Sequence, residues 1–185
     1  MSARRWSISR CRRGTAAVEL ALISPMMLIL LAGIIDFGRA YRDEIALSSA
    51  VAAAAQYALN NAASINSGSA ASLAATISGI VANSNGAAWA GTTVTVNDGA
   101  TSAVAGGNTT ASGTAANANS CWCPTGSLAN WSWGTAAVCG SACAGGTLAG
   151  KFVTIAGTRA FSAVFSNYGL IPNATLHESA IVQSQ

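Results

Sequence analysis

The longest apolar run of the chain lies near its N-terminus. Residues 15–35 (TAAVELALISPMMLILLAGII) contain one charged residue, Glu19. A helix of this length spans roughly 31 Å, close to the thickness of a bilayer hydrocarbon core. Five arginines precede the run, which predicts a cytoplasmic N-terminus with the rest of the chain outside. Pro25 lies inside the span, where a membrane helix tolerates proline if neighbouring groups compensate for the lost hydrogen bond.

A helical pattern continues beyond the apolar run. Residues 36–60 are rich in alanine and contain no proline, so one helix of about 69 Å is expected from 15 to 60. Asp36 and Arg39, and Arg39 and Asp43, are spaced for helical ion pairs. One face carries the larger apolar residues, namely Phe37, Tyr41, Ile45, Ala52, Ala55 and Leu59. This face predicts either packing between neighbouring helices or coverage of the chain's own sheet, and the first is favoured.

The distal half alternates between short periodic segments and turn-rich segments. After a break at 64–70, the spacing of apolar residues predicts a helix over 69–83 and a strand over 92–97. Residues 99–120 are almost all Gly, Ala, Ser, Thr and Asn, which is typical of an irregular loop. Three strands are expected after Gly150, separated by breaks at Gly157 and at 169–173. Sequential strands with short turns indicate an antiparallel sheet.

Five cysteines divide into one near the N-terminus, Cys11, and four clustered in the distal half, Cys121, Cys123, Cys139 and Cys143. Clustered cysteines in an exported domain predict two disulfides. A zinc site and a redox dithiol are weaker alternatives, because the spacing does not match the paired cysteines of either. Two connectivities cross the intervening loop and one closes each pair locally. The cross-loop forms are preferred because a bridge between residues two apart is strained. Trp122, Trp131 and Trp133 are expected to pack on the bridges; a carbohydrate or partner face is the alternative.

Charge is scarce, which excludes several functions. Charged residues make up 8% of the 185 residues, and from residue 45 onward two bases (Lys151, Arg159) balance two acids (Asp98, Glu178). A nucleic-acid-binding surface needs more cations than this. The single histidine, His177, stands beside Glu178 in a predicted strand, and no hydrolase, metalloprotease or phosphate-binding motif is present. The sequence therefore predicts no enzyme, no cofactor and no metal.

The residues around Glu19 form a recognisable pattern. Basic residues, Gly14, four residues and then a glutamate precede the rest of the apolar run. A carboxylate in a membrane helix is costly and usually functional. This arrangement resembles a prepilin-type signal, in which a peptidase cuts after the glycine. Cutting after Gly14 would leave Thr15 as the new N-terminus and place Glu19 at mature position five. A plain signal anchor and a cleaved secretory signal are the alternatives.

The segment 12–58 extends this resemblance. Its Arg-Arg-Gly, Ala-Val-Glu, early proline, Gly-Ile-Ile-acid-Phe-Gly-Arg and alanine-rich continuation resemble the N-terminal motif of the TadE-like family, the minor pseudopilins of Flp-type (tight-adherence) pilus systems. Leu20 departs from the aromatic residue that Flp-type pilins usually have there. The ending, with cysteines, strands and a Pro-Asn turn, resembles the family more softly.

The resemblance implies an α+β, pilin-like fold. Residues 1–14 would be a leader, 15–35 a transmembrane helix and 36–63 a stalk helix. Residues 64–185 would be a small disulfide-bonded antiparallel β-sheet domain outside the cytoplasm.

The resemblance also implies a function in assembly. Glu19 of an incoming subunit would pair with the N-terminal amine of its neighbour. The implied partners are a prepilin peptidase, other pilins, the inner-membrane assembly platform and the bacterial inner membrane. The alternatives are a membrane-anchored surface binding module and a pseudopilin of a type II secretion system.

Overall fold

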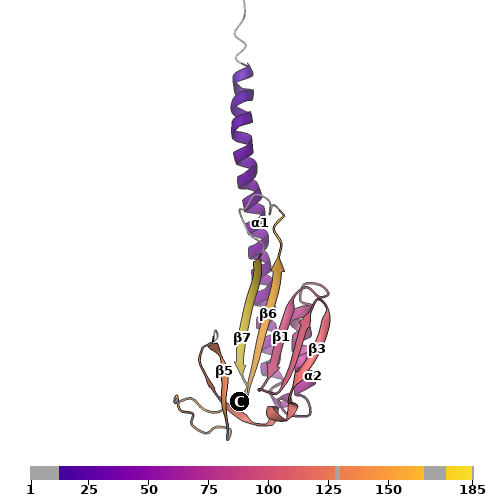
Figure 1. Cartoon of the computed structure of the whole chain (residues 1–185), viewed down its shortest axis with the longest axis vertical. Helices are drawn as coiled ribbons and strands as arrows, with labels where there is room; N and C mark the ends of the chain where they lie inside the picture. Colours follow the sequence, from indigo (N-terminus) through magenta and orange to yellow (C-terminus); the bar gives the residue numbers. More distant parts are fainter. Residues whose placement is uncertain (1–12, 128–129, 165–173, 185) are drawn as a thin grey trace, which may run out of the picture.

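The computed structural model describes residues 13–127, 130–164 and 174–184, and places a long helix ahead of an α+β domain (Figure 1). Four of the five leader arginines, Cys11 and the turn predicted at 169–173 lie outside the described residues. The first half of helix α1 projects away from the domain, and its second half runs along the sheet (Figure 1). The α+β class with a long N-terminal apolar helix is confirmed.

Helix α1 is continuous from Arg13 to Asn60, as the sequence predicted for 15–60. Pro25 lies inside it and removes the N–H that would bond to the carbonyl of Ala21. The hydroxyl of Ser24 lies 3.5 Å from that carbonyl oxygen and donates to it. A serine beside the proline thus supplies part of the missing hydrogen bonding, as polar side chains commonly do in membrane helices.

Helix α2, Ala70–Ala82, follows a short 3₁₀ turn, η1 (Ala62–Ser64). It is the helix expected over 69–83. Leu73, Ile77 and Val81 are buried on its inner face, and Ile80 is partly buried. The side-chain oxygen of Asn66 accepts hydrogen bonds from the backbone N–H groups of Gly68 and Ser69, at 2.9 and 3.1 Å. These bonds turn the chain from α1 into α2.

Five antiparallel strands form the main sheet, in the order β3-β2-β1-β6-β7. Their bounds are β1 Gly91–Val96, β2 Ala100–Ala105, β3 Asn108–Gly113, β6 Phe152–Phe161 and β7 Ala174–Gln183. α1 packs on β6 and β7, and α2 packs on β1 and β2. The core between the helices and the sheet contains small side chains from α1 and α2, among them Ala54, Ala58 and Ala74, so the layers approach closely.

The prediction of an irregular loop over 99–120 is wrong. Strands β2 and β3 occupy most of it, followed by a 3₁₀ turn, η2 (Ala115–Asn119). Ala100, Ser102 and Val104 alternate inward along β2 and are 2–8% exposed. The hydroxyl of Ser102 lies 2.8 Å from that of Ser78 on α2, so this buried polar pair is satisfied. Backbone pairing with β1 and small inward side chains define the strand, although large apolar residues are few.

The prediction of a break between two strands at Gly157 is also wrong. β6 passes straight through this position, and the two strands expected on either side form one strand that pairs with β7 from Phe152 to Phe161. A Cβ at position 157 would lie 3.0 Å from Leu47 Cδ1 and 3.1 Å from Val51 Cγ2. The absence of a side chain at Gly157 therefore lets α1 pack closely against the sheet.

Asn97 joins the sheet to the distal part of the chain. It is fully buried, has a φ of 53° and follows β1. Its amide nitrogen donates to the carbonyls of Ala118 and Ser120 at 3.1 and 2.6 Å, and its side-chain oxygen accepts from the Phe152 N–H at 3.2 Å. Its own carbonyl accepts from the indole of Trp122 at 3.2 Å. One side chain thus fixes three separate segments.

Candidate assembly segment and distal hairpin

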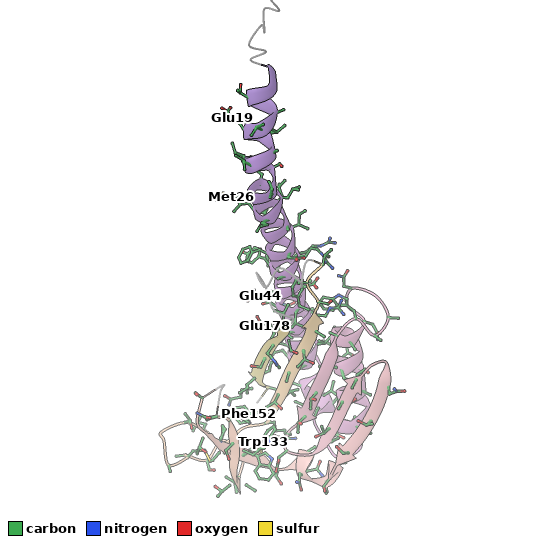
Figure 2. All side chains as sticks on the ribbon, turned by 45° about the horizontal axis from the view of Figure 1, so that its top comes forward. Glu19, Met26, Glu44, Trp133, Phe152 and Glu178 are labelled. Atoms are coloured by element: carbon green, nitrogen blue, oxygen red, sulfur yellow. A yellow bond between two sulfur atoms is a disulfide. The ribbon has the colours of Figure 1, made fainter. Side chains whose placement is uncertain are left out.

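The N-terminal half of α1 is bare. Within the described residues, one helix is long and apolar enough to cross a membrane, the segment Gly14–Asn60, and 6% of its most apolar window is buried. Leu22, Met26 and Leu30 are 59–75% exposed. Figure 2 shows Glu19 and Met26 on the part of the helix that no strand accompanies. A surface this apolar is stable in lipid or against other apolar helices, not in water.

Gly14, Thr15 and Glu19 lie in the first turns of this bare segment and are exposed. Together with Val18 they line one shallow surface hollow. Thr15 and Glu19 are four residues apart and hence on one face of the helix. A Cβ added at Gly14 would meet no atom within 4 Å, so folding does not require glycine there.

The stalk part of α1 has two apolar faces with different surroundings. Leu47, Ala50, Val51, Ala54 and Ala58 are 0–4% exposed and pack on the domain. On the face that the sequence singled out, Phe37, Tyr41, Ile45 and Leu59 are 48–67% exposed. The helix therefore covers its own sheet with one face and leaves about half or more of each large side chain on the other face exposed, including two aromatic rings.

Charged residues fix α1 to the domain at two levels. Asp36 and Arg39 form the predicted pair, at 3.7 Å between Oδ1 and Nη1. Asp43 pairs instead with Arg159 of β6, at 3.8 Å, and not with Arg39 as the spacing suggested. The guanidinium of Arg159 also lies 5.2 Å from the ring centroid of Trp89 and donates to the Trp89 carbonyl. The sequence pattern did not predict this role, although a lone arginine in a nearly uncharged stretch is a signal for it.

Asp36 has a second, unforeseen partner. Its carboxylate is 3% exposed, and Oδ1 accepts a hydrogen bond of 2.9 Å from the backbone N–H of Val164, three residues after β6 ends. Arg39 lies 6.0 Å from the ring centroid of Phe161, the last residue of β6. The end of β6 is thus attached to α1 directly after the apolar run.

The four distal cysteines form two disulfides, Cys121–Cys139 and Cys123–Cys143. This is one of the two cross-loop connectivities. The bridges hold a separate two-stranded sheet of β4 (Cys121–Thr125) and β5 (Ser132–Ala137). Cys121 is buried, and the backbones of Trp122 and Gly150 exchange hydrogen bonds of 2.8 and 3.1 Å. These contacts tie the hairpin to the start of β6.

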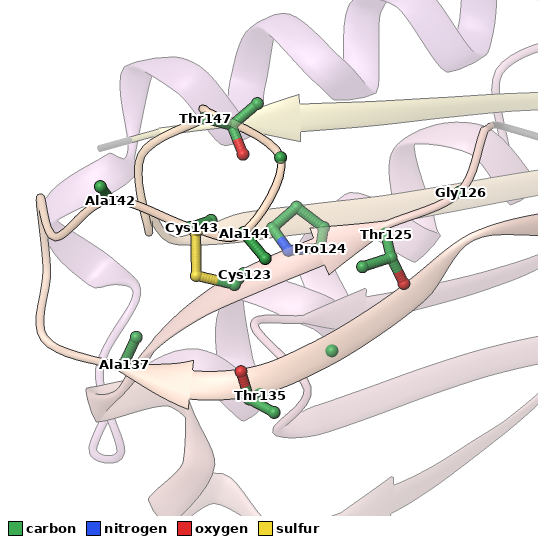
Figure 3. A pocket seen from close by; sticks show the side chains of 12 residues that line it. Cys123, Pro124, Thr125, Gly126, Thr135, Ala137, Ala142, Cys143, Ala144 and Thr147 are labelled. Atoms are coloured by element: carbon green, nitrogen blue, oxygen red, sulfur yellow. A yellow bond between two sulfur atoms is a disulfide. The ribbon is translucent and has the colours of Figure 1, made fainter.

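A hollow of about 650 Å³ lies beside the Cys123–Cys143 bridge (Figure 3). Its lining is made of small and weakly polar residues, including Pro124, Thr135 and Thr147, and contains no charged side chain. The ring of Trp131 contacts those of Trp133 at 5.8 Å and Phe152 at 5.5 Å, both edge-on; packing of the tryptophans on the bridges stays a prediction. The hollow offers shape and apolar contact but no group for acid–base or nucleophilic chemistry.

The remaining polar candidates do not converge. His177 is exposed on the edge strand β7, next to the half-buried Glu178. In the part of the chain that the structure describes, no group of three or more His, Cys, Asp or Glu side chains is placed to hold a metal ion. The amine of Lys151 donates to the Ile65 carbonyl at 2.7 Å. Both cations beyond residue 45 therefore make internal contacts.

Comparison with known proteins gave one result that bears on function. The sequence model of a family described as TadE-like protein matches residues 14–56. No curated protein and no solved structure gave a significant match. The matched segment begins at Gly14, includes Glu19 and the whole apolar run, and ends inside the stalk part of α1. Residues 14–56 are therefore similar to the TadE-like family, which is the family that the N-terminal motif indicated.

Proposed function

We propose that the chain is a minor pseudopilin of a Flp-type, tight-adherence pilus system. The observation that carries the proposal is the coincidence of two features on one helix. The TadE-like match covers residues 14–56, and these residues form a continuous helix that is bare where it is most apolar and packed where it meets the sheet. A helix built in this way can be a membrane anchor first and a packing element between subunits afterwards.

The proposed topology follows from charge and disulfides. Residues 1–14 would be the leader, 15–35 the span of the bacterial inner membrane, 36–63 the stalk and 64–185 the domain on the outer side. Arginines before the span favour a cytoplasmic N-terminus. The two disulfides of the distal hairpin suit an oxidising compartment outside the cytoplasm.

Assembly would begin with a cut by a prepilin peptidase after Gly14. The cut removes five of the nine bases and none of the six acids, which leaves four bases against six acids. It also creates an ammonium group at Thr15. Opposite charges attract strongly at the edge of a low-dielectric phase, so Glu19 of an incoming subunit would pair with the Thr15 amine of its neighbour. The assembly platform and other pilins are the implied partners.

The exposed face of the stalk would then pack against neighbouring subunits. Phe37, Tyr41 and Ile45 are more than half exposed, so much of their apolar surface is available to a neighbour. Small exposed residues further along α1, such as Ala52 on the same face and Ala53 beside it, allow close approach of a second helix. The chain's function in this scheme is structural rather than catalytic.

Processing is the first test. Mass spectrometry of the membrane fraction should show a chain that starts at Thr15, and Gly14→Ala should block the cut without unfolding the chain. Gly38→Ala is the matched control, because a Cβ at Gly14 or at Gly38 meets no atom within 4 Å. This variant should be processed normally. A chain that keeps Met1 in cells making the peptidase would refute the pseudopilin proposal.

The role of Glu19 is the second test. Glu19→Leu should be inserted, cut after Gly14 and stable, because the side chain is remote from the sheet and loss of a charge eases insertion. It should fail to co-purify with other pilins from cross-linked membranes and fail to support piliation. Glu44→Leu removes an exposed carboxylate from the same helix beyond the predicted span and is the control. Normal piliation with Glu19→Leu would show that this carboxylate does not set subunit register.

One observation favours a second candidate, a membrane-anchored surface binding module. The hollow beside Cys123 and Cys143 is open and mostly apolar. It lies at the end of the molecule opposite the N-terminal half of α1 (Figures 1 and 3). A module of this kind needs no cut after Gly14, so the processing experiment separates the two candidates. A pseudopilin of a type II secretion system shares the cut; the identity of the pilins that co-purify distinguishes it.

A further inference from the structure

Asp36 is unusual because it is a buried carboxylate at the end of an apolar run. It is the first charged residue after Glu19 in the sequence and is 3% exposed. Burial of a carboxylate is costly unless partners compensate. Here the backbone N–H of Val164 donates to Oδ1 at 2.9 Å, and Arg39 lies 3.7 Å away. The chain after β6 is therefore held on α1 at the level of Asp36.

Helix geometry gives the depth of this contact. Seventeen residues separate Glu19 from Asp36, or about 26 Å along a helix axis. A bilayer hydrocarbon core is about 30 Å thick. The proposed span of 15–35 ends one residue before Asp36, and a span that starts at Glu19 ends about 20 residues further on, close to Arg39. A tilt of the helix shortens its projection and moves Asp36 deeper. The Asp36–Val164 contact thus lies at the outer boundary of the membrane or just inside it.

The side chains at this level suit lipid. Val164 is 60% exposed, whereas Phe161 and Ala163 face inward at 4% and 7%. Among the described residues beyond α1, the large hydrophobic side chains with comparable exposure are Val138 and Leu148, both in the disulfide-bonded region. On α1, Ile35 and Phe37 flank Asp36 in sequence and are 49% and 67% exposed.

The arrangement of the strands agrees with this depth. Figure 1 shows that β6 and β7 extend further along α1 toward its N-terminal half than β1 or β3 does. The end of β6 is thus the described part of the sheet that comes nearest to the apolar run. Arg39 has a half-exposed side chain and follows the run by one turn, where a cation meets the phosphates of the headgroup layer.

We propose that residues 161–164 at the end of β6 are seated in the interfacial layer of the outer leaflet before assembly, with the Val164 side chain in contact with lipid. The Asp36–Val164 hydrogen bond would act as a clasp that sets the height of the sheet above the membrane. This inference rests on the proposed membrane span. The surface that contacts residues 161–164 is lipid rather than a second copy of the chain.

Spin-label accessibility on the full chain tests the inference. Cys11→Ser leaves the two disulfides as the remaining cysteines, so under non-reducing conditions a nitroxide reacts with one introduced thiol. Three positions are compared, Val164→Cys, Ile29→Cys in the span and Ser112→Cys on the exposed strand β3. The protein is reconstituted in vesicles of phosphatidylethanolamine and phosphatidylglycerol. Collision with oxygen, which concentrates in lipid, is measured against collision with a water-soluble nickel chelate.

The ratio of oxygen to nickel accessibility should be several-fold higher at position 164 than at 112, and lower than at 29. A lipid-like signal at 29 with equal ratios at 164 and 112 would overturn the inference and leave the membrane span intact. An aqueous signal at 29 would overturn the span itself and this inference with it. A label at 164 that neither reagent reaches, and whose spectrum broadens with protein density, would place a second copy there instead of lipid.

The clasp is tested separately with Asp36→Ala, made once in the Val164→Cys background and once in the Ile29→Cys background. Loss of the acceptor should raise nickel accessibility at 164 several-fold while the value at 29 stays unchanged. An unchanged value at 164 would show that the strand end reaches the lipid without Asp36 and would refute the clasp.

Discussion

Gly157 offers a test of how closely α1 approaches the sheet. Gly157→Ala places a Cβ 3.0 Å from Leu47 Cδ1, 3.1 Å from Val51 Cγ2 and 3.3 Å from Val81 Cγ1. These contacts are tighter than packed methyl groups allow, so three side chains from two helices would have to recede. Overpacking of this kind costs about 1–3 kcal/mol, and replacement of a strand glycine returns about 0.5–1 kcal/mol of backbone entropy. The net destabilisation expected is about 0.5–2 kcal/mol.

The assay is denaturant unfolding of the oxidised full chain in detergent, followed by tryptophan fluorescence. At about 4 °C per kcal/mol, the melting temperature should also fall by about 2–8 °C. Gly79→Ala is the matched control, because a Cβ there meets no atom within 4 Å and Gly79 lies in the interior of α2. The control should be stabilised by up to about 1 kcal/mol.

A double-mutant cycle with Leu47→Ala assigns the cause. Leu47 is fully buried, and its truncation alone should cost about 2–5 kcal/mol. Because truncation makes room for the new Cβ, Gly157→Ala should cost nothing or become stabilising in the Leu47→Ala background, which gives a coupling energy of about 1 kcal/mol or more. Wild-type stability of Gly157→Ala, or the same loss in both backgrounds, would refute close packing as the reason for the glycine.

Three further predictions concern the distal part of the chain. Asn97→Ala should lower the free energy of unfolding by about 2–4 kcal/mol in denaturant titration, because it leaves buried carbonyl and N–H groups without partners; a loss below 0.5 kcal/mol would contradict this role. Cys139→Ser should cost about 2–5 kcal/mol and lower the abundance of the protein on immunoblots, whereas non-reducing peptide mapping of the wild type should find Cys121 joined to Cys139 and Cys123 to Cys143. Burial raises the pKa of Asp98 above its ordinary value of 3.8, so the charged form opposes folding at neutral pH. Asp98→Asn, at a φ of 51° that asparagine tolerates, should therefore raise the melting temperature at pH 7 and lose this advantage as the pH falls below 3.8; an advantage that persists at low pH would exclude desolvation as its cause.

The helices were predictable because their patterns are local. The bounds of α1 and α2 follow from alanine content, apolar periodicity and turn residues within each segment. The strand at Thr92–Val96 was predictable for the same reason, since threonine and valine alternate along it. Nothing beyond the neighbouring residues is needed to identify such elements.

The errors arose where tertiary contacts define the structure. β2 and β3 consist of small residues that match a loop in composition, and their identity as strands comes from pairing with β1. Gly157 matched a break because its role depends on Leu47 and Val51, which lie more than a hundred residues earlier in the chain. The partners of Asp36 and Asp43, Val164 and Arg159, are equally remote in sequence.

The candidate assembly residues Gly14, Thr15 and Glu19 were predicted from a short motif, since their proposed chemistry concerns a peptidase and a neighbouring subunit rather than the fold. The pairing of the cysteines was not found in this way. Composition and spacing left two cross-loop connectivities open, and the geometry of the β4–β5 hairpin decides between them.

Because α1 is continuous, its N-terminal half and the sheet domain are connected as one rigid unit. The helix enters the core at Leu47 without an intervening loop, and Asp36 and Asp43 attach it to the end of β6 and to Arg159. Any rotation of the membrane segment about its axis must therefore turn the whole sheet by the same angle. A neighbouring subunit that bound the exposed helix inside the bilayer would therefore set which face of the domain points outward. It would do so from some tens of ångströms away, without contact to the domain.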